Sequence, residues 1–156
     1  MPSKLGKPVK YTLDTNIFID AFRTPDASAS LQRFLARALP HTFLSAVVIQ
    51  ELLAGAMTAK ATAVLERGVI GPFMRRRRIC APTAGAYRES GRVLAALARE
   101  HGSHFVRANR SLPNDTLLAA SCREHGITLI TNDQDFALLA HHLGAWKSVP
   151  PWPGSA

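Results

Sequence analysis

The chain has 156 residues, 47% of them hydrophobic and 19% charged, which is the composition of one folded domain and excludes a disordered segment. No run of about 20 apolar residues could span a membrane, and no apolar signal core follows the basic N-terminus, so a cytoplasmic protein is expected. Lysine and arginine outnumber aspartate and glutamate by 19 to 11, and the resulting charge of +8 favours an anionic partner such as nucleic acid.

Short β-rich runs alternate along the chain with segments of helical period. The runs lie at residues 9–14, 42–45, 77–82 and 128–132, with a shorter candidate at 146–150. Helical patterns cover residues 30–39, 46–68, 83–102 and 114–126. This alternation predicts an α/β fold with a central, mostly parallel sheet covered by helices.

The pattern predicts one domain over residues 9–150, preceded by a flexible basic N-terminus at 1–8 and followed by a proline-rich tail at 151–156. Residues 103–114 have no clear period and contain Arg107 and Arg110, which predicts a loop or irregular turn carrying basic charge. Cys80 and Cys122 fall inside apolar segments, where free cysteine usually behaves as a small buried hydrophobe, so no disulfide is expected.

The first predicted strand, in the stretch VKYTLDTNIFID, runs into Asp14. In open parallel sheets ligands bind at the carboxyl ends of the strands, so Asp14 is a candidate ligand-binding residue. Aspartate is also a good N-cap for the helical segment that follows, although Asn16 is equally able to cap it. For Asp14 alone the two interpretations are equally supported.

Glu51, in SAVVIQELLAG, lies on the stripe of a helix that faces the core, and Ser45 is the expected start of that helix. A carboxylate in this position must be paired, protonated or bound to a cation, because burying an unpaired charge is costly. A salt bridge to an arginine is the ordinary alternative to a cation.

Two more carboxylates occupy comparable places further along the chain. Asp115 opens the helical segment at 114–126, although N-capping is the favoured interpretation for this residue by itself. Asp133 closes the strand at 128–132, and Asp135 follows two residues later. Strand ends and the first turns of the following helices share one edge of a parallel sheet, which brings together Asp14, Glu51, Asp115 and Asp133.

Four carboxylates converging in one cleft would repel one another at neutral pH, and no lysine lies within these motifs. A divalent cation is therefore the expected neutraliser. Ligation by oxygen alone selects Mg²⁺ or Mn²⁺ over zinc. The histidines do not change this expectation, because they have no cysteine or histidine partners at zinc-site spacing.

Three segments, LDTNIFID, LSAVVIQELLAG and PNDTLLAASCREHGITLITNDQDF, resemble the successive motifs of the PIN-domain nucleases, especially the VapC-type toxins of bacterial toxin–antitoxin pairs. The resemblance extends over nearly the whole predicted domain. It implies a three-layer α/β/α fold, a metal-dependent endoribonuclease activity on RNA, a small antitoxin protein that blocks the site, and a homodimer.

Residue by residue, the resemblance assigns Asp14, Glu51, Asp115 and Asp133 to the acidic quartet of that family, which is catalytic and binds the metal. Asn16 and Thr131 match polar positions that help to order the site in the family. Asp135 matches a more variable position.

Two basic segments between Glu51 and Asp115 are candidates for RNA contact and for substrate or partner specificity. One segment contains Arg107 and Arg110. The other, for which a solvated loop is the slightly favoured interpretation, is the run of Arg75, Arg76, Arg77 and Arg78.

Other functions fit parts of the pattern. A housekeeping RNA-processing nuclease would share the fold and the acidic residues. A receiver-like signalling domain also gathers acids and Mg²⁺ at the carboxyl edge of a parallel sheet, but it needs a lysine beyond a late strand, and Lys147 is the only candidate. A binding protein without chemistry would be favoured if one of the four acids were absent, and all four are present.

Overall fold

The strands form a five-stranded sheet in the order β3-β2-β1-β4-β5, and all four neighbouring pairs are parallel. The computed structural model describes residues 6–153. Each of the five segments predicted to be extended overlaps a strand, which confirms the predicted α/β fold with a parallel sheet. The strands are β1 (Lys10–Leu13), β2 (Thr42–Ser45), β3 (Ile79–Cys80), β4 (Ile127–Ile130) and β5 (Ser148–Val149).

The central strand, β1, brings the candidate site together. It pairs with β2 through Tyr11 and Thr42, and with β4 through Leu13 and Ile130. The ladder with β4 continues one residue further, because the Asp14 N–H donates to the Ile130 carbonyl at 2.9 Å. Since the strands are parallel, the residues that follow β1, β2 and β4 emerge at the same edge of the sheet.

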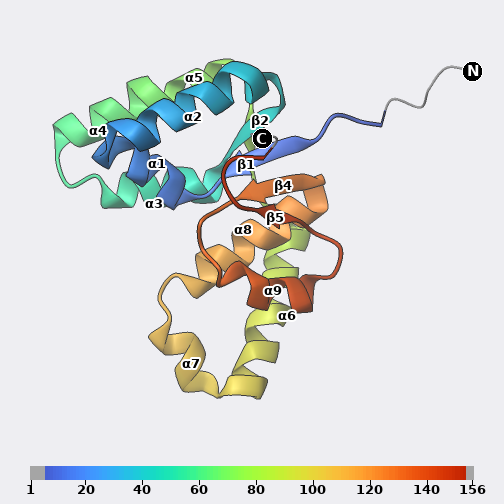
Figure 1. Cartoon of the computed structure of the whole chain (residues 1–156). Coiled ribbons are helices and arrows are strands. Elements are labelled where there is room, and N and C mark those ends of the chain that lie inside the picture. Colours follow the sequence, from blue (N-terminus) through green and yellow to red (C-terminus); the bar gives the residue numbers. More distant parts are fainter. Residues whose placement is uncertain (1–5, 154–156) are drawn as a thin grey trace, which may run out of the picture.

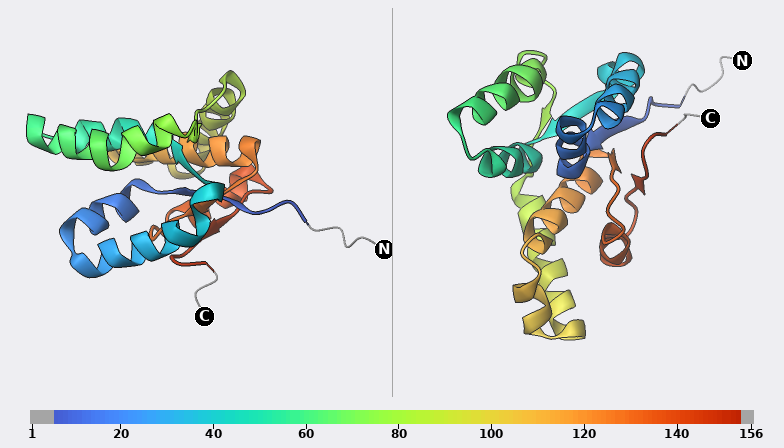
Figure 2. Two further views of the ribbon diagram at one scale, coloured as in Figure 1. Left: turned by 90° about the horizontal axis from the view of Figure 1, so that it is seen from above. Right: turned by 60° about the vertical axis from the view of Figure 1, so that its left-hand side comes forward.

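Helices lie on both sides of this sheet, so the molecule has three layers (Figure 1). α1 packs on α2, whereas α8 packs on α6, α9 and α3. The end of α6 and the short α7 project away from the sheet (Figure 2). The bounds are α1 (Thr15–Arg23), α2 (Pro25–Ala38), α3 (Ala46–Gly55), α4 (Ala59–Leu65), α5 (Gly71–Arg75), α6 (Ala84–His101), α7 (Ser103–Ala108), α8 (Leu112–His125) and α9 (Phe136–Leu143), with short irregular helices at Leu39–His41 and Glu66–Ile70.

Two helical segments differ from their predictions. The helical pattern at 46–68 is interrupted after Gly55, and α4 begins beyond Thr58, whose hydroxyl accepts from the Ala61 N–H at 3.1 Å. Residues 103–114, predicted as a loop or irregular turn, contain α7 and the first turn of α8, so that prediction was wrong. Pro113 lies inside this first turn, where a missing N–H removes no helical hydrogen bond.

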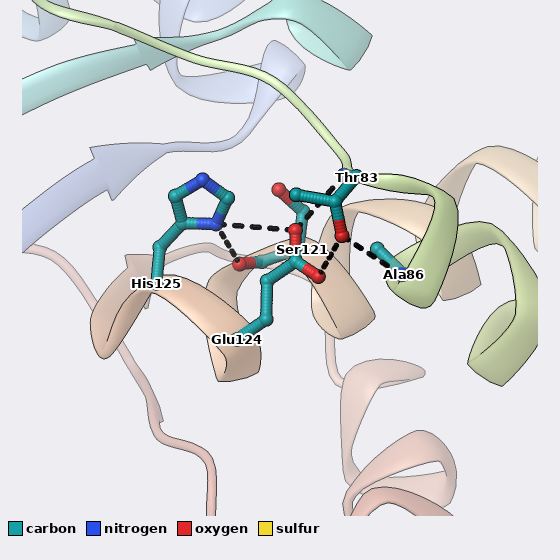
Figure 3. Close-up of polar contacts among 5 residues, drawn as sticks. All are labelled: Thr83, Ala86, Ser121, Glu124 and His125. Atoms are coloured by element: carbon teal, nitrogen blue, oxygen red, sulfur yellow. Dashed lines mark hydrogen bonds and ion pairs between the residues drawn. The ribbon is translucent and has the colours of Figure 1, made fainter.

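A polar cluster joins the start of α6 to the end of α8 (Figure 3). Thr83 is the N-cap of α6, and its N–H and hydroxyl both donate to the Glu124 carboxylate, at 2.9 and 2.6 Å. His125 Nδ1 lies 3.4 Å from the same carboxylate and 3.0 Å from the Ser121 carbonyl oxygen. One glutamate thus fixes the placement of one helix against the other.

The core between the layers is apolar and contains both cysteines, which are buried and free as predicted. Burial raises the pKa of the Cys80 thiol to about 11. α8 ends at Gly126, whose φ of 64° places it in the left-handed region that glycine adopts without strain. Within residues 6–153, no helix is both long and apolar enough to cross a membrane.

The described part of the proline-rich tail packs on α2. The Trp152 ring stacks on Phe34 with 5.0 Å between ring centroids. The Arg37 guanidinium lies over the Phe34 ring, 5.8 Å from its centroid, and donates to the Pro153 carbonyl at 3.4 Å. Residues 6–8 are exposed, while residues 1–5 and 154–156 lie outside the described part, so the predicted flexible N-terminus and the domain boundaries stay predictions.

Candidate active site

Asp14 lies at the centre of the acidic edge and is 4% exposed. Its carboxylate accepts from the Thr15 N–H at 2.8 Å and from the Thr131 hydroxyl at 2.7 Å. Asp14 is therefore the N-cap of α1 as well as the innermost carboxylate, and the two interpretations of this residue are compatible. Burial raises the pKa of Asp14, the two hydrogen bonds oppose the shift, and the charge of Asp133 adds to it.

Asn16, the alternative cap, is exposed on α1 and does not cap the helix. The residue that joins two carboxylates is Thr15, whose backbone N–H donates to Asp14 and whose hydroxyl donates to Glu51 at 3.2 Å. Thr15 was missed in the sequence analysis, although it stands between two residues that were singled out. The sequence did offer one signal for Thr15, which is its position directly after Asp14, the candidate helix cap.

Glu51 reaches the site from α3, which begins after the cap residue Ser45 as predicted. It is the sixth residue of that helix, so the expectation that all four acids lie at strand ends or in first turns was wrong for Glu51. Burial raises the pKa of Glu51, the hydrogen bond from Thr15 lowers it, and the charge of Asp14 raises it further. No described lysine or arginine forms an ion pair with Glu51, so the arginine salt bridge is not found among residues 6–153.

Asp115 lies in the first turn of α8, three residues inside the helix start. Ser111 occupies the N-cap position, so the capping interpretation favoured for Asp115 was wrong. Burial raises the pKa of Asp115 to about 7, a bond from Ser111 opposes this shift, and the charges of the three other acids each raise it further. Asp14, Glu51 and Asp133 therefore lie near enough to Asp115 for their charges to raise its pKa.

The turn after β4 supplies the last acid. The Thr131 hydroxyl donates to Asp14 and also accepts from the Asp133 N–H at 2.9 Å. The Asp133 carboxylate in turn accepts from the Asp135 N–H at 2.8 Å. Asp135 is exposed and lines a small cavity beside Asp115, at the start of α9. Thr131 therefore connects two members of the quartet, while the Asp135 carboxylate lies outside this network.

The run of four arginines lies away from the carboxylates, at the amino end of β3. Arg78 precedes this strand, and its carbonyl accepts from the Leu44 N–H. The Arg78 guanidinium lies over the Phe43 ring at 5.7 Å and donates to the Pro40 carbonyl, so this side chain is engaged within the protein. Arg75, Arg76 and Arg77 are exposed, and their role as RNA contacts stays a prediction.

Arg107 lies in α7, and Arg110 lies between α7 and α8. Arg107 donates to the Ser103 hydroxyl at 2.7 Å. Arg110 is exposed and immediately precedes Ser111, the residue whose hydroxyl lowers the pKa of Asp115. A role in RNA binding for these two arginines also stays a prediction.

The oxygen ligands that this site offers are of the kind that a hard divalent cation prefers. They belong to four carboxylates that form no ion pair with described residues, and three of these carboxylates have raised pKa values because they are crowded and partly buried. As the side chains lie, no group of three or more histidine, cysteine, aspartate or glutamate residues among 6–153 is positioned to hold a metal ion. Binding would therefore require these side chains to move closer together.

Comparison with protein families finds a PIN domain over residues 11–141, which covers most of the chain. The chain belongs to the PIN-domain family. No curated protein sequence matches it significantly. The fold of this PIN domain is shared with solved VapBC and FitAcB structures and with a toxin–antitoxin complex from Klebsiella pneumoniae.

Three of these structures illustrate the likeness. DNA-bound VapBC from Salmonella typhimurium is 19% identical with a TM-score of 0.66, over 92% of this chain and 98% of that one. FitAcB from Neisseria gonorrhoeae is 21% identical with a TM-score of 0.63, over 92% and 99%. DNA-bound VapBC2 from Rickettsia felis is 21% identical with a TM-score of 0.59, over 92% and 99%. At these identities the likeness establishes the fold alone.

Proposed function

We propose that this PIN-domain protein is a metal-dependent endoribonuclease and the toxin of a toxin–antitoxin pair. The observation that carries the proposal is that four carboxylates near the carboxyl edge of the sheet influence one another electrostatically and form no ion pair within residues 6–153. Family membership supports a nuclease, and the fold shared with solved toxin–antitoxin structures supports the toxin role.

The residues that would hold Mg²⁺ or Mn²⁺ are Asp14, Glu51, Asp115 and Asp133. When bound, such a cation supplies positive charge that stabilises the charge developing on a phosphodiester during hydrolysis. Thr131 and Thr15 hold the carboxylates in place through hydrogen bonds. Because Asp14 is almost fully buried, its carboxylate is fixed by these donors rather than by water.

This protein has a surface beside Glu51 to which a small antitoxin could bind and so block the site. A groove between α1, α3 and α4 is lined by Glu51 itself and by the apolar side chains of Phe22 and Val64, which are 51% and 48% exposed. Exposed apolar residues beside a charged site are typical of a protein interface. An antitoxin segment that lies in this groove would cover the approach to Glu51.

The structure disfavours the receiver-like alternative. Lys147 immediately precedes β5, and its carbonyl accepts from the Leu129 N–H. It therefore lies at the amino edge of the sheet, opposite the carboxylates, where it cannot complete a receiver site. A housekeeping RNA-processing enzyme stays an alternative, and the homodimer stays a prediction.

Expression in a host cell, alone and together with any short reading frame found beside the gene, tests the proposal. The toxin role predicts growth arrest by the protein alone and normal growth when the neighbouring product is co-expressed. Purified protein should cleave RNA with Mg²⁺ or Mn²⁺ and lose this activity in excess EDTA. Cleavage without growth arrest would favour the housekeeping nuclease, and undiminished cleavage in EDTA would exclude the metal-dependent mechanism.

A further inference from the structure

A second pocket lies at the amino edge of the sheet and is lined by four basic side chains. Lys7 and Lys10 come from the segment entering β1, Arg123 from the last turn of α8, and Lys147 from the residue before β5. Lys10 pairs in register with Ile127, the first residue of β4, so these groups surround the beginnings of three neighbouring strands. Two acids of the quartet, Asp14 and Asp133, follow the other ends of β1 and β4.

The charge of this basic pocket is not compensated within the described residues. No aspartate or glutamate is among its lining residues, and all four basic side chains are exposed. None of the four forms an ion pair with another residue in the range 6–153. Cations gathered without counter-charges create a local positive potential that attracts anions.

Aromatic side chains lie among these cations. Trp146 lines the pocket, is partly exposed, and is held by an edge contact with Phe136 at 6.0 Å between ring centroids. Tyr11 also lines the pocket and packs edge-on against Phe34. Cations that follow a backbone of phosphates, together with aromatic rings for the bases, are the combination that binds single-stranded nucleic acid. An acidic peptide would use the cations and leave the rings without a role.

We infer that this basic pocket is a second RNA-binding site, which holds phosphates of the substrate strand away from the point of cleavage. The inference rests on the proposed ribonuclease function. Lys10 and Asp14 are four residues apart along an extended strand, so about 13 Å separates the pocket from the acidic edge along β1. A long RNA reaches both sites and a dinucleotide reaches one. The pocket therefore lowers KM for long RNA and leaves kcat unchanged, because it binds substrate and transition state equally.

The test compares two variants, each of which loses three positive charges. The pocket variant carries Lys10→Gln, Arg123→Gln and Lys147→Gln. The control variant carries Arg33→Gln, Arg88→Gln and Arg99→Gln, three exposed arginines outside the pocket. Binding of fluorescently labelled single-stranded RNA is measured by anisotropy in EDTA over a range of salt concentrations, after thermal melts confirm that both variants are folded.

The pocket variant should bind long RNA more weakly, and the slope of log affinity against log salt should flatten by about 2 units if each cation contacts one phosphate. Arg123→Gln alone should flatten the slope by about 0.7 units. The control variant should keep the slope of the wild type. Equal weakening by both variants would overturn the inference, and so would an acidic peptide or inorganic phosphate that displaces RNA from the wild type at comparable concentration.

The same proteins separate failure of this inference from failure of the proposed function. Wild-type protein that cleaves RNA, with a pocket variant of unaltered KM and salt slope, would overturn the second site only. Wild-type protein that binds RNA through the pocket and cleaves none in Mg²⁺ or Mn²⁺ would overturn the nuclease proposal only. A rise in KM for long RNA, with dinucleotide cleavage unchanged, is the expected result.

Discussion

Thr131 organises two of the four carboxylates with a single hydroxyl group. It donates to Asp14 at 2.7 Å, accepts from the Asp133 N–H at 2.9 Å, and is 6% exposed. Thr131→Val keeps the shape of this side chain and removes both bonds, so the affinity for Mn²⁺ should fall by about 10- to 100-fold. Thr131→Ser keeps the hydroxyl and should stay near the wild type. Calorimetric titration with Mn²⁺ measures both, and equal affinities of the two variants would contradict this role.

Asp115 should make the metal-free protein less stable as pH rises. Its pKa is about 7 in the folded chain, because of burial and then the three neighbouring charges, against an ordinary value of 3.8. The folded state thus binds this proton more tightly than the unfolded state does, and the stability it contributes is present in full below about pH 4. That stability is lost as pH rises to about 7. Thermal melts in EDTA should show this decline for the wild type, and a flatter profile for Asp115→Asn.

The two aspartates of the last turn should differ in their importance. Asp133 lies in the network with Thr131 and Asp14, whereas Asp135 is exposed and joins it through its backbone N–H alone. Asp133→Asn should therefore reduce the cleavage rate at least about tenfold more than Asp135→Asn does. Rates measured at saturating Mg²⁺ provide the comparison. Similar losses from both changes would mean that the fourth ligand is shared or wrongly assigned.

The acidic residues could be found from the sequence because each has a recognisable context, either a strand end or the apolar face of a helix. The side chains that position them were harder to find. Asn16 was expected to support the site and is exposed, whereas Thr15 makes the bond to Glu51. Which of two adjacent helical residues points inward depends on how α1 is rotated against α3, and sequence spacing does not determine this rotation.

At the scale of elements, strands were easier to predict than helix boundaries. The strands stood out as β-rich runs, and each was confirmed. α9 was not predicted, because an eight-residue segment is too short to show a helical period clearly. α7 was taken as part of a loop for the same reason, and Pro113 concealed the first turn of α8. Packing against α6 decides the conformation of α7, and that contact is not visible in the local sequence.

The Glu124 cluster should hold α6 against α8. Glu124→Ala removes two hydrogen bonds to Thr83, the cap residue of α6, and should lower the free energy of unfolding by about 1–2 kcal/mol. Glu89→Ala breaks a surface ion pair with Arg92 and should cost less than about 0.5 kcal/mol. Urea unfolding of both variants measures the difference. A smaller loss for Glu124→Ala than for Glu89→Ala would show that the cluster does not join the helices.

At the scale of the whole molecule, charge is divided between the two edges of one sheet. Four carboxylates lie towards the carboxyl ends of the strands, and four cations without ion-pair partners in residues 6–153 line a pocket where the strands begin, on a chain whose net charge is +8. The net charge could be read from the sequence and favours an anionic partner. The place of the basic pocket could not, because Lys7, Arg123 and Lys147 are brought together by the order of the strands.

The cleavage rate of RNA as a function of Mg²⁺ concentration, for the wild type and for Asp14→Asn and Asp115→Asn, tests the central claim most directly. The wild type should cleave only when Mg²⁺ is present. Both variants should fold and show no cleavage at any Mg²⁺ concentration, because each removes one ligand charge from the quartet. Their thermal stability in EDTA should equal or exceed that of the wild type, since each change relieves repulsion. A folded Asp14→Asn or Asp115→Asn protein that keeps most of the wild-type rate would contradict the assignment of the site.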